Sequence, residues 1–264
     1  MKSTLIFLLL PVLLVIGFLV LPLLALFFKM LPQEGIWQTL QQPLVTEALR
    51  LSVITSLSSL LLAVLFGTPI AYLLARYRLP GAALLDTLID LPMVLPPTVA
   101  GVALLMAFGR RGLLGSWLDA VGMQIGFTTV AVVLAQSFVS TPFYIRAARA
   151  GFQSVDQELE RVAYTLGHSA FSTFLRVTVP LALPALLGGA VMAWARALGE
   201  FGATIMFAGN LIGRTQTMPL AIYIAMESDL TAALVLSAIL VIVSFSVLFC
   251  VRSLLRRSPF GAYA

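Results

Sequence analysis

Six long apolar runs constrain the fold of this 264-residue chain more than any other feature. They are Leu5–Phe28, Leu49–Ala75, Leu88–Phe108, Phe127–Ile145, Leu181–Phe207 and Thr231–Val251. About 20 apolar residues are enough for a helix to cross a hydrocarbon core of roughly 30 Å. Inside a bilayer every backbone N–H and C=O group needs a partner within the protein, and a helix supplies it. We therefore predict an all-α membrane protein with about six transmembrane helices, folded as one integral membrane domain over residues 1–264.

The composition agrees with a membrane protein and excludes an ordinary soluble domain. Hydrophobic residues make up 60% of the chain, charged residues 10%, and the mean hydropathy is +1.04. The first run follows Lys2 as the core of a signal peptide would. It is too long for one and has no small-x-small cleavage site before Lys29, so we expect a retained anchor. The net charge of +5 gives no reason to expect a nucleic-acid partner, and the single Cys250 can form no internal disulfide.

The distribution of basic residues predicts the orientation of the chain. If both termini are cytoplasmic, ten basic residues lie on the cytoplasmic side and four on the external side. The ten are Lys2, Arg76, Arg78, Arg146, Arg149, Arg161, Arg176, Arg252, Arg256 and Arg257, and the four are Lys29, Arg110, Arg111 and Arg214. Because cytoplasmic loops carry the excess of Lys and Arg, we predict cytoplasmic termini. The segment Leu159–Pro180 then also lies in the cytoplasm.

This segment differs from the rest of the chain because it is short, charged and amphipathic. Its first part ends at Gly167 and has apolar residues at helical spacing: Leu159, Val162, Ala163 and Leu166. A second amphipathic part, with Phe171, Phe174 and Leu175, ends at Pro180. Two short helices that face water but keep an apolar side need a protein partner to cover that side. We predict a docking element, with His168 as a surface residue.

Charged residues within or beside the spans are the next candidates, because ionisable groups are costly at membrane depth and usually face the bundle interior. Arg196 and Glu200 are four residues apart in the fifth run, which places them on one helix face, where they could pair. Two interpretations stay open: a neutralised pair that holds the bundle together, or an arginine that gives positive character to an anion path or gate. Asp86 and Asp90 share a face near the start of the third run, where a carboxylate suits the helix dipole.

Prolines and small hydroxyl residues mark two other spans. Pro92, Pro96 and Pro97 make the third run irregular, which fits either a kinked, cavity-lining helix or simple packing. Small hydroxyl residues crowd the second run, and they indicate close helix packing. They are Ser52, Thr55, Ser56, Ser58 and Ser59.

The sequence contains no phosphate-cradling glycine loop, nucleophile elbow or metal-ligand cluster. We therefore expect a protein that is not an enzyme, with no catalytic residue, no metal site and no cofactor of its own. A secondary anion transporter is an alternative, although such proteins more often show an internal repeat, and none is visible here.

The segment Leu159–Pro180 resembles the cytoplasmic loop of permease subunits of binding-protein-dependent ABC importers. That family's loop has the form E-A-A, three residues, Gly, nine residues, then I-x-L-P. Gly167 fits the glycine, and Val177-Thr178-Val179-Pro180 fits the tail at the right spacing. Ala163 matches the second alanine, Val162 replaces the first, and Arg161 stands at the family's Glu position with Glu160 just before it. The resemblance covers residues 48–251, the core of a type I permease.

A second stretch resembles the molybdate branch of this family. It comprises Ala195-Arg196-Ala197-Leu198-Gly199-Glu200-Phe201-Gly202-Ala203-Thr204, then Gly213-Arg214-Thr215-Gln216-Thr217, together with Leu95-Pro96-Pro97-Thr98-Val99-Ala100-Gly101. Sulfate permeases share the Arg-x-x-Gly-Glu core and the proline-rich third span. The resemblance therefore implies an oxyanion importer, with molybdate as the expected anion and tungstate, sulfate or thiosulfate as alternatives.

The resemblance also implies partners and site residues. Two copies would form the pore in a bacterial cytoplasmic (inner) membrane, surrounded by lipid. Two cytoplasmic ATP-binding subunits would carry the ATP and Mg²⁺, and an extracytoplasmic molybdate-binding protein would deliver the anion. The expected ATPase-coupling residues are Glu160, Arg161, Ala163, Gly167, Val177 and Pro180. The expected path or gate residues are Arg196, Glu200, Thr204, Pro96 and Pro97.

Overall fold

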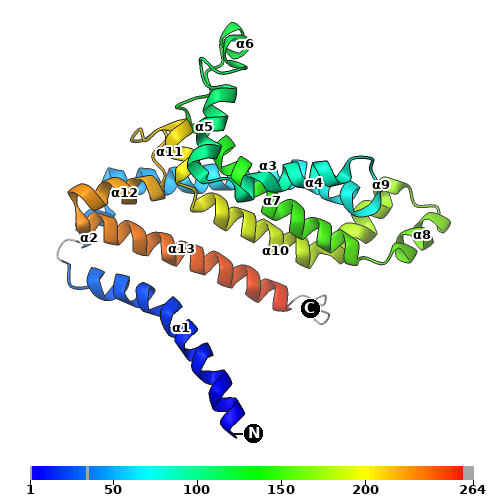
Figure 1. Cartoon of the computed structure of the whole chain (residues 1–264), viewed down its shortest axis with the longest axis horizontal. Coiled ribbons are helices and arrows are strands. Elements are labelled where there is room, and N and C mark those ends of the chain that lie inside the picture. The colour runs from blue at the N-terminus through cyan, green and yellow to red at the C-terminus, as the bar shows by residue number, and fades with distance from the viewer. Residues whose placement is uncertain (1, 34–35, 258–264) are drawn as a thin grey trace.

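The computed structural model describes residues 2–33 and 36–257, and the side chains of residues 2–8, 252 and 254–257 lie outside that description. Every regular element in the described part is a helix, which confirms the all-α prediction. Four long helices form a bundle: α3 (Pro43–Arg76), α7 (Thr129–Ser154), α10 (Val179–Leu198) and α13 (Leu230–Arg257) (Figure 1). The side chains of Lys2, Arg252, Arg256 and Arg257, four of the basic residues used to predict orientation, lie outside the described residues.

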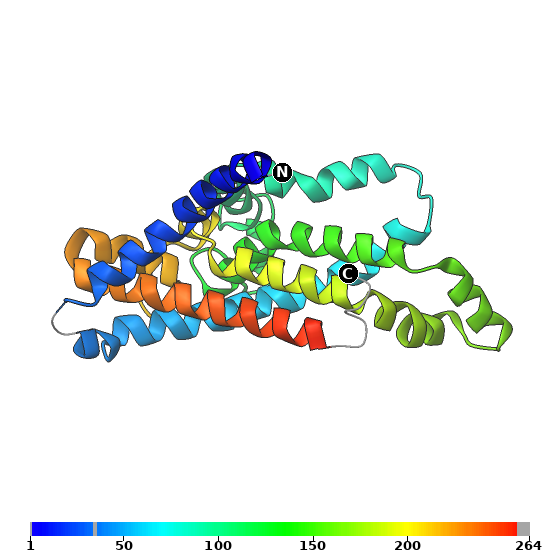
Figure 2. The ribbon, with the colours of Figure 1, turned by 90° about the horizontal axis from the view of Figure 1, so that it is seen from below.

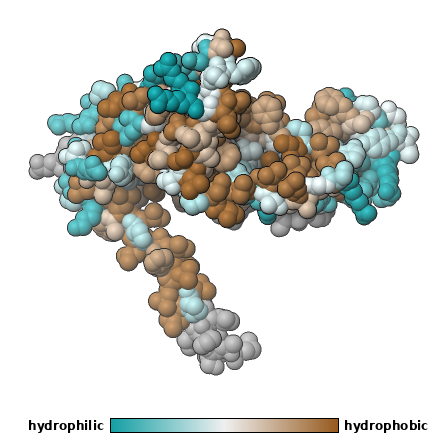
Figure 3. Space-filling view, turned by 45° about the horizontal axis from the view of Figure 1, so that its top comes forward, coloured by the Kyte–Doolittle hydropathy of each residue, from teal (hydrophilic) through white to brown (hydrophobic). Residues whose placement is uncertain are grey.

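The first span leaves this bundle. Helix α1 (Lys2–Met30) contacts α13, and its remainder projects away from the other helices (Figures 1 and 2). None of its membrane-length apolar stretch is buried within the chain. Figure 3 shows apolar residues along α1 and along much of the bundle, and hydrophilic residues at the two ends of the bundle and at the top of the view, where α5 and α6 project. This distribution is typical of a structure that crosses a bilayer.

The third apolar run forms two helices instead of one. Helix α4 (Ala82–Val94) and helix α5 (Pro97–Phe108) meet at an angle of 115°. The bend falls at Leu95 and Pro96, which have extended backbone, and neither Pro96 nor Pro97 has an N–H to continue the helical ladder. The third run is therefore not one straight helix but a bent pair, either a broken span or a re-entrant loop, and the irregularity predicted from its prolines is confirmed as a sharp bend.

The same helices correct the interpretation of Asp86 and Asp90. Helix α4 begins at Ala82 and has no acidic residue in its first turn, so the helix-dipole interpretation is wrong. The two carboxylates instead pair with arginines of α7. Asp86 accepts a hydrogen bond from Arg149 at 2.5 Å, and Asp90 pairs with Arg146. These ion pairs hold the first half of the bent span against the bundle.

The fifth apolar run differs from its prediction at both ends. Helix α9 (Ala170–Thr173), the π-helical turn η1 (Phe174–Thr178) and α10 follow one another without a break, so the amphipathic part does not end at Pro180. Pro180 lies in the first turn of α10, and the wider π turn before it accommodates its missing N–H. At the other end α10 stops at Leu198, and a short helix α11 (Gly202–Ala208) follows after Gly199, Glu200 and Phe201.

Four other short helices complete the described chain. They are α2 (Ile36–Leu40), α6 (Gly115–Ala120), α8 (Gln157–Thr165) and α12 (Met218–Ser228). Helices α8 and α9 lie at one end of the bundle and α2 and α12 at the other, while α5 and α6 project from its side (Figure 1). Among the described residues, five helices are long and apolar enough to cross a membrane, and the bent pair of α4 and α5 makes a sixth candidate span.

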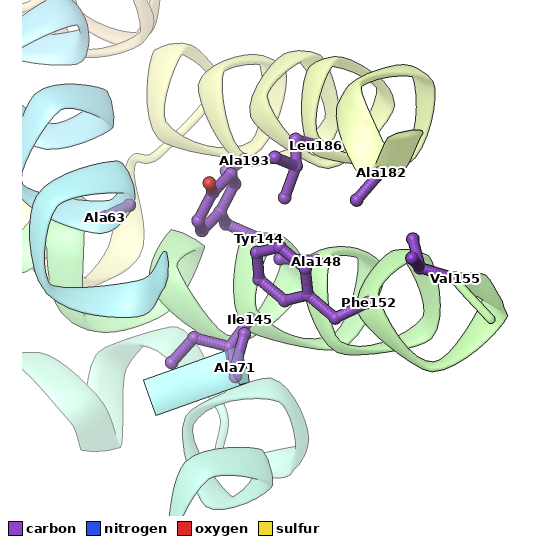
Figure 4. Packing of buried hydrophobic residues seen from close by; sticks show 10 residues of the cluster. All are labelled: Ala63, Ala71, Tyr144, Ile145, Ala148, Phe152, Val155, Ala182, Leu186 and Ala193. Carbon is purple, nitrogen blue, oxygen red and sulfur yellow. The ribbon is translucent and has the colours of Figure 1, made fainter. Parts of the chain in front are cut away.

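Small side chains allow the central helices to pack closely. Ser52, Thr55, Ser56 and Ser59 of α3 are buried, which confirms the predicted close packing. Ser59 makes hydrogen bonds with hydroxyls of α7, at 3.3 Å to Ser140 and 3.1 Å to Ser137. Farther along, Figure 4 shows side chains of α3, α7 and α10 packed into one apolar cluster around Tyr144 and Phe152. This packing makes α3, α7 and α10 a stiff unit.

Candidate functional site

The segment Leu159–Pro180 begins as two short helices joined by a turn at Gly167, as predicted. Helix α8 starts at a capping Asp156, whose side chain accepts a hydrogen bond from the Glu158 N–H at 2.9 Å. Gly167 has a φ of +85°, a conformation that side-chain-bearing residues rarely adopt. The N–H groups of Gly167 and His168 donate to the carbonyls of Tyr164 and Ala163 at 3.0 and 3.1 Å. This pair of bonds ends α8 and redirects the chain into α9.

One side of this two-helix segment is apolar and uncovered within the chain. Leu166 and Phe171, on either side of the turn, are 75% and 72% exposed. Leu159, Val162 and Leu175 are also exposed, whereas Ala163 is buried against the loop itself. We call the exposed set Leu159, Val162, Leu166, Phe171 and Leu175 the apolar face of the loop. Val177 and Pro180 are partly buried where the loop joins α10.

The two charged candidate residues of α8, Arg161 and Glu160, have different surroundings. Arg161 is exposed and pairs with Glu158 at 2.5 Å on the surface of the helix. Glu160 is buried, and one of its oxygens accepts hydrogen bonds from Arg76 Nε at 3.1 Å, Arg76 Nη2 at 2.8 Å and the Thr178 hydroxyl at 2.8 Å. Arg76 Nη2 also donates to the Val155 carbonyl at 3.0 Å. Glu160 is therefore the acidic residue with buried partners, and Arg161 is not.

Sequence reasoning missed Arg76 and Thr178 as partners of Glu160. A signal was present, because Glu160 and Ala163 are three residues apart and share the inward face of α8. An acidic residue on the same face as a buried alanine is itself expected to be buried, and a buried charge needs a partner. The partner itself, 84 positions away at the end of α3, follows only from the fold.

The second candidate site lies where the fifth span is interrupted. Arg196 Nη1 lies 2.7 Å from Glu200 Oε2, so the predicted pair is present. Glu200 does not share a helix face with Arg196, however, because α10 has already ended at Leu198. The other Glu200 oxygen accepts a hydrogen bond from the Ala203 N–H at 2.7 Å, at the start of α11. The Glu200 side chain is 1% exposed, and its carboxylate joins α10 to α11.

The interrupted fifth span packs directly against the bent third span. A Cβ atom on Gly202 would lie 2.7 Å from Pro97 Cβ, and one on Gly101 would lie 2.7 Å from the Ala203 carbonyl oxygen. Only glycine allows α5 and α11 to approach this closely. Thr204, in the first turn of α11, is fully buried, and its hydroxyl has no hydrogen-bond partner among the described residues. Of the predicted path residues, Arg196 and Glu200 pair where α10 ends, Pro97 lies against Gly202 at the start of α11, and Pro96 is at the bend.

A cavity lies at the end of α7 opposite the loop. Its volume is about 340 Å³, and its lining includes Arg110, Arg214, Asp119, Gln124 and Thr128. Arg110 lies 4.0 Å from Asp119, and the Arg214 backbone carbonyl accepts a hydrogen bond from Thr129. The lining of the cavity thus includes two arginines, an aspartate and neutral polar residues.

Within residues 2–33 and 36–257, no group of three or more His, Cys, Asp or Glu side chains is placed to hold a metal ion. What the described residues do provide is a helical loop with an apolar face at one end and two interrupted spans in contact near the centre. These features define the class of protein: a polytopic helical membrane protein with an exposed amphipathic two-helix segment and two interrupted spans.

Residues 67–258 match the family described as "Binding-protein-dependent transport system inner membrane component", and the chain belongs to this family. It is 44% identical over 252 residues to the molybdenum transport system permease protein ModB of Mycobacterium tuberculosis, which covers 96% of this chain and 94% of that protein. It is 36% identical over 211 residues to a probable sulfate transport system permease protein of Nephroselmis olivacea, with 80% and 74% covered.

Solved structures confirm the predicted type I permease fold. A crystal structure of a bacterial ABC transporter that imports the acidic polysaccharide alginate matches with a TM-score of 0.77 and 17% identity, over 98% of this chain and 96% of that chain. A second structure of a bacterial alginate ABC transporter, in complex with an alginate pentasaccharide-bound periplasmic protein, matches with a TM-score of 0.76 and 15% identity, over 97% and 95%. The prediction of a transport subunit, made from the cytoplasmic loop motif, is confirmed by the family.

Proposed function

We propose that this chain is the permease subunit of an ATP-driven molybdate importer. The observation that carries the proposal is the 44% identity to a molybdenum permease over nearly the full length of both proteins. The sulfate permease relative is less similar and matches a smaller part of each chain, so sulfate or thiosulfate is the second candidate substrate. Tungstate, another tetrahedral dianion, is a further alternative.

The complex contains two copies of this chain in the cytoplasmic (inner) membrane of a bacterium. The uncovered apolar length of α1 supports a second copy, because a projecting helix can pack on a neighbouring subunit as well as on lipid. Basic residues at the loop end of the bundle, Arg76, Arg78 and Arg161 among them, support placing that end and both termini in the cytoplasm.

ATP and Mg²⁺ belong to two ATPase subunits that dock beneath the permease, and this chain binds neither. The apolar face of the loop supports this assignment, because exposed Leu166 and Phe171 need a protein cover. When ATP draws the two ATPase subunits together, the loop moves with them. A two-helix lever with an ordered turn at Gly167 can transmit such a movement, whereas a flexible loop could not.

The gate lies at the junction of the bent third span and the interrupted fifth span. Irregular backbone at membrane depth is tolerated where it is buried in protein or lines a water-filled cavity. Movement about the bend at Pro96 and Pro97 and about Gly199–Phe201 would open or close the route for the anion. The geometry of Arg196 fits both roles considered above, a neutralised structural pair and a positive charge beside the anion route. The pair with Glu200 neutralises its charge, while 29% of its side chain remains exposed.

An extracytoplasmic binding protein delivers the anion. The alginate importer of the same fold has been solved with a periplasmic protein bound, which supports a partner of this kind. Strong selectivity then belongs to the binding protein, since a route for permeation must bind its ion weakly enough to release it.

Co-purification of an ATPase subunit tests this proposal against a secondary anion transporter. The permease is co-expressed with the ATPase subunit of the same organism and purified in detergent through a tag on the permease alone. We expect the two subunits in equal amounts, and a Leu166→Glu/Phe171→Glu variant should lose the ATPase because it places charge on the apolar face. A permease that is purified alone and takes up anion in response to an ion gradient without ATP would contradict the proposal.

A further inference from the structure

A buried charge cluster ties the cytoplasmic loop to the ends of the long helices. We propose that Glu160 is a positioning residue for coupling, which acts through Arg76 and Thr178 to transmit movement of α8 to α3 and α10. This inference rests on the proposed function, because it assumes that an ATPase subunit moves the loop. It adds a pathway within this chain that runs from Glu160 to Arg76 and Thr178, two residues that the loop motif does not single out.

The hydrogen bonds of this cluster join four separate segments. Arg76 is the last residue of α3, Val155 is the residue that caps the end of α7, Glu160 lies in α8, and Thr178 ends η1, which runs directly into α10. The Arg76 guanidinium donates both to Glu160 and to the Val155 carbonyl, while the Thr178 hydroxyl donates to the same Glu160 oxygen. A displacement of Glu160 must therefore move the ends of three long helices or break charged hydrogen bonds.

Burial makes these bonds stronger than an ordinary surface contact. The side chains of Arg76 and Glu160 are 6% and 9% exposed. Charged hydrogen bonds in a low-dielectric setting are short and strong, and loss of one partner leaves the other charge buried without compensation. The cluster therefore favours movement of α8 together with the ends of the long helices over movement of α8 alone.

Helix α8 has little else to hold it to the bundle. It is nine residues long, and Glu160 and Ala163 are its buried residues. Ala163 contributes only a methyl group, so Glu160 provides the polar anchor on the inward side of the helix. Val162 of α8 and Leu166, the residue that caps its end, are exposed and belong to the apolar face. Helix α8 thus has exposed apolar residues available to a partner and a buried carboxylate, Glu160, bonded to the bundle.

The neighbouring ion pair provides a natural control. Glu158 and Arg161 lie on the same helix with the same charges, but their side chains are 65% and 67% exposed. Exposed pairs of this kind contribute little because solvent screens them. The family motif has its Glu at the position of Arg161, whereas the structure places the buried carboxylate one residue earlier. Glu158→Gln and Glu160→Gln are therefore matched substitutions with opposite expected outcomes.

The test measures movement of the permease and ATP hydrolysis in the same complex. Cys250 is replaced by Ser, and a spin label is placed at Arg50→Cys, near the end of α3 opposite the loop. Pulsed electron paramagnetic resonance then reports the distance between the two copies of this position before and after ATP addition. This readout requires the ATPase but no particular anion, so it does not depend on the choice of molybdate as substrate.

We expect the parent complex and the Glu158→Gln variant to show the same ATP-dependent change in this distance. Glu160→Gln should keep the ATPase bound and hydrolysing ATP, and should lose most of the distance change. In reconstituted vesicles it should take up about tenfold less anion per ATP, a size typical of coupling between sites. Thr178→Val, which removes one donor and no charge, should give a smaller loss in the same direction.

A double variant separates coupling from folding. Glu160→Gln alone leaves Arg76 without its counter-ion, so its complex could fail to assemble for reasons of stability. Arg76→Met/Glu160→Gln removes both charges, and its complex should assemble and hydrolyse ATP but remain uncoupled. A double variant that moves and transports like the parent would overturn the inference and leave the pair a structural one. A parent permease that binds no ATPase subunit would overturn the proposed function together with this inference.

Discussion

The Arg196 guanidinium meets the Glu200 carboxylate across the point where helix α10 ends, with 2.7 Å between Nη1 and Oε2. The carboxylate then accepts the Ala203 N–H, so one side chain both neutralises the arginine and fixes the start of α11. The position of Arg196 in the last turn of α10 is favourable in itself, because a cation stabilises the C-terminal end of a helix.

A double-mutant cycle tests whether the two residues form one electrostatic unit. Glu200→Ala leaves the arginine unpaired and removes the bond to Ala203, and we expect a loss of roughly 3 kcal/mol of stability with loss of transport. Arg196→Ala should cost less, because the partly exposed arginine is lost but the bond from Ala203 remains. The double variant should recover part of the summed loss, measured by thermal unfolding in detergent. Strictly additive effects would show that the two side chains do not interact.

The close approach of α5 and α11 gives a second prediction. Gly101→Val would drive a side chain into the Ala203 backbone, which lies 2.7 Å from the position of the new Cβ. Overpacking of this kind costs about 1–3 kcal/mol, and we expect it to separate the bent span from the interrupted one and to abolish uptake.

Gly188 in α10 is the matched control for this substitution, because a Cβ atom there meets nothing within 4 Å. Gly188→Val should keep the folded yield of the parent. Equal loss of folded protein for both variants would mean that the contact between α5 and α11 is not the cause.

The turn at Gly167 gives a third prediction. A Cβ atom at this position meets nothing within 4 Å, so the cost of a side chain comes from the positive φ alone. Gly167→Val should cost about 1–2 kcal/mol in this turn and should weaken ATPase binding or uncouple it from uptake. Gly167→Asn should be milder, because asparagine tolerates this backbone conformation. Comparable uptake and ATPase retention in the Val variant and the parent would argue against an ordered lever.

The sequence predicted the spans more successfully than their interruptions. Apolar length identifies α1, α3, α7 and α13 because each is one helix. Hydropathy carries no information about the direction of the helix axis. The sequence-based spans therefore joined α4 to α5, and α10 to α11, as single runs. Pro96 and Pro97 indicated an irregular helix but not the size of the bend. Gly199, next to Glu200, is a residue type that often ends a helix, but the i, i+4 spacing of Arg196 and Glu200 favoured a continuous helix instead. The prediction of the ion pair was correct, but its premise, that both residues lie on one helix face, was not.

The candidate site shows the same limit. Gly167 and the two helices around it are local features, and local periodicity predicted them. The choice between Glu160 and Arg161 depends on Arg76, a residue at the end of a distant helix. No pattern within α8 identifies that partner, because the bond exists only after α3, α7 and α10 have packed together.

Substrate binding gives a fourth prediction. Discrimination between molybdate and sulfate, tetrahedral dianions that differ mainly in size, is easier in a closed pocket with matched donors than in a route for permeation. Isothermal titration of the purified permease dimer should therefore give a dissociation constant no tighter than roughly 1 mM, or about −4 kcal/mol. A micromolar, saturable site would contradict this expectation, and the cavity lined by Arg110 and Arg214 would be the first place to look for it.

ATP-dependent uptake by the reconstituted complex tests the central claim most directly. The permease, its ATPase subunit and the binding protein of the same organism are placed in vesicles, and radiolabelled molybdate and sulfate are supplied in turn with ATP or with a non-hydrolysable analogue. We predict uptake of molybdate that requires both hydrolysable ATP and the binding protein, with little uptake of sulfate. Uptake of sulfate in preference to molybdate, or uptake that continues without ATP, would contradict the account of this chain as a molybdate importer permease.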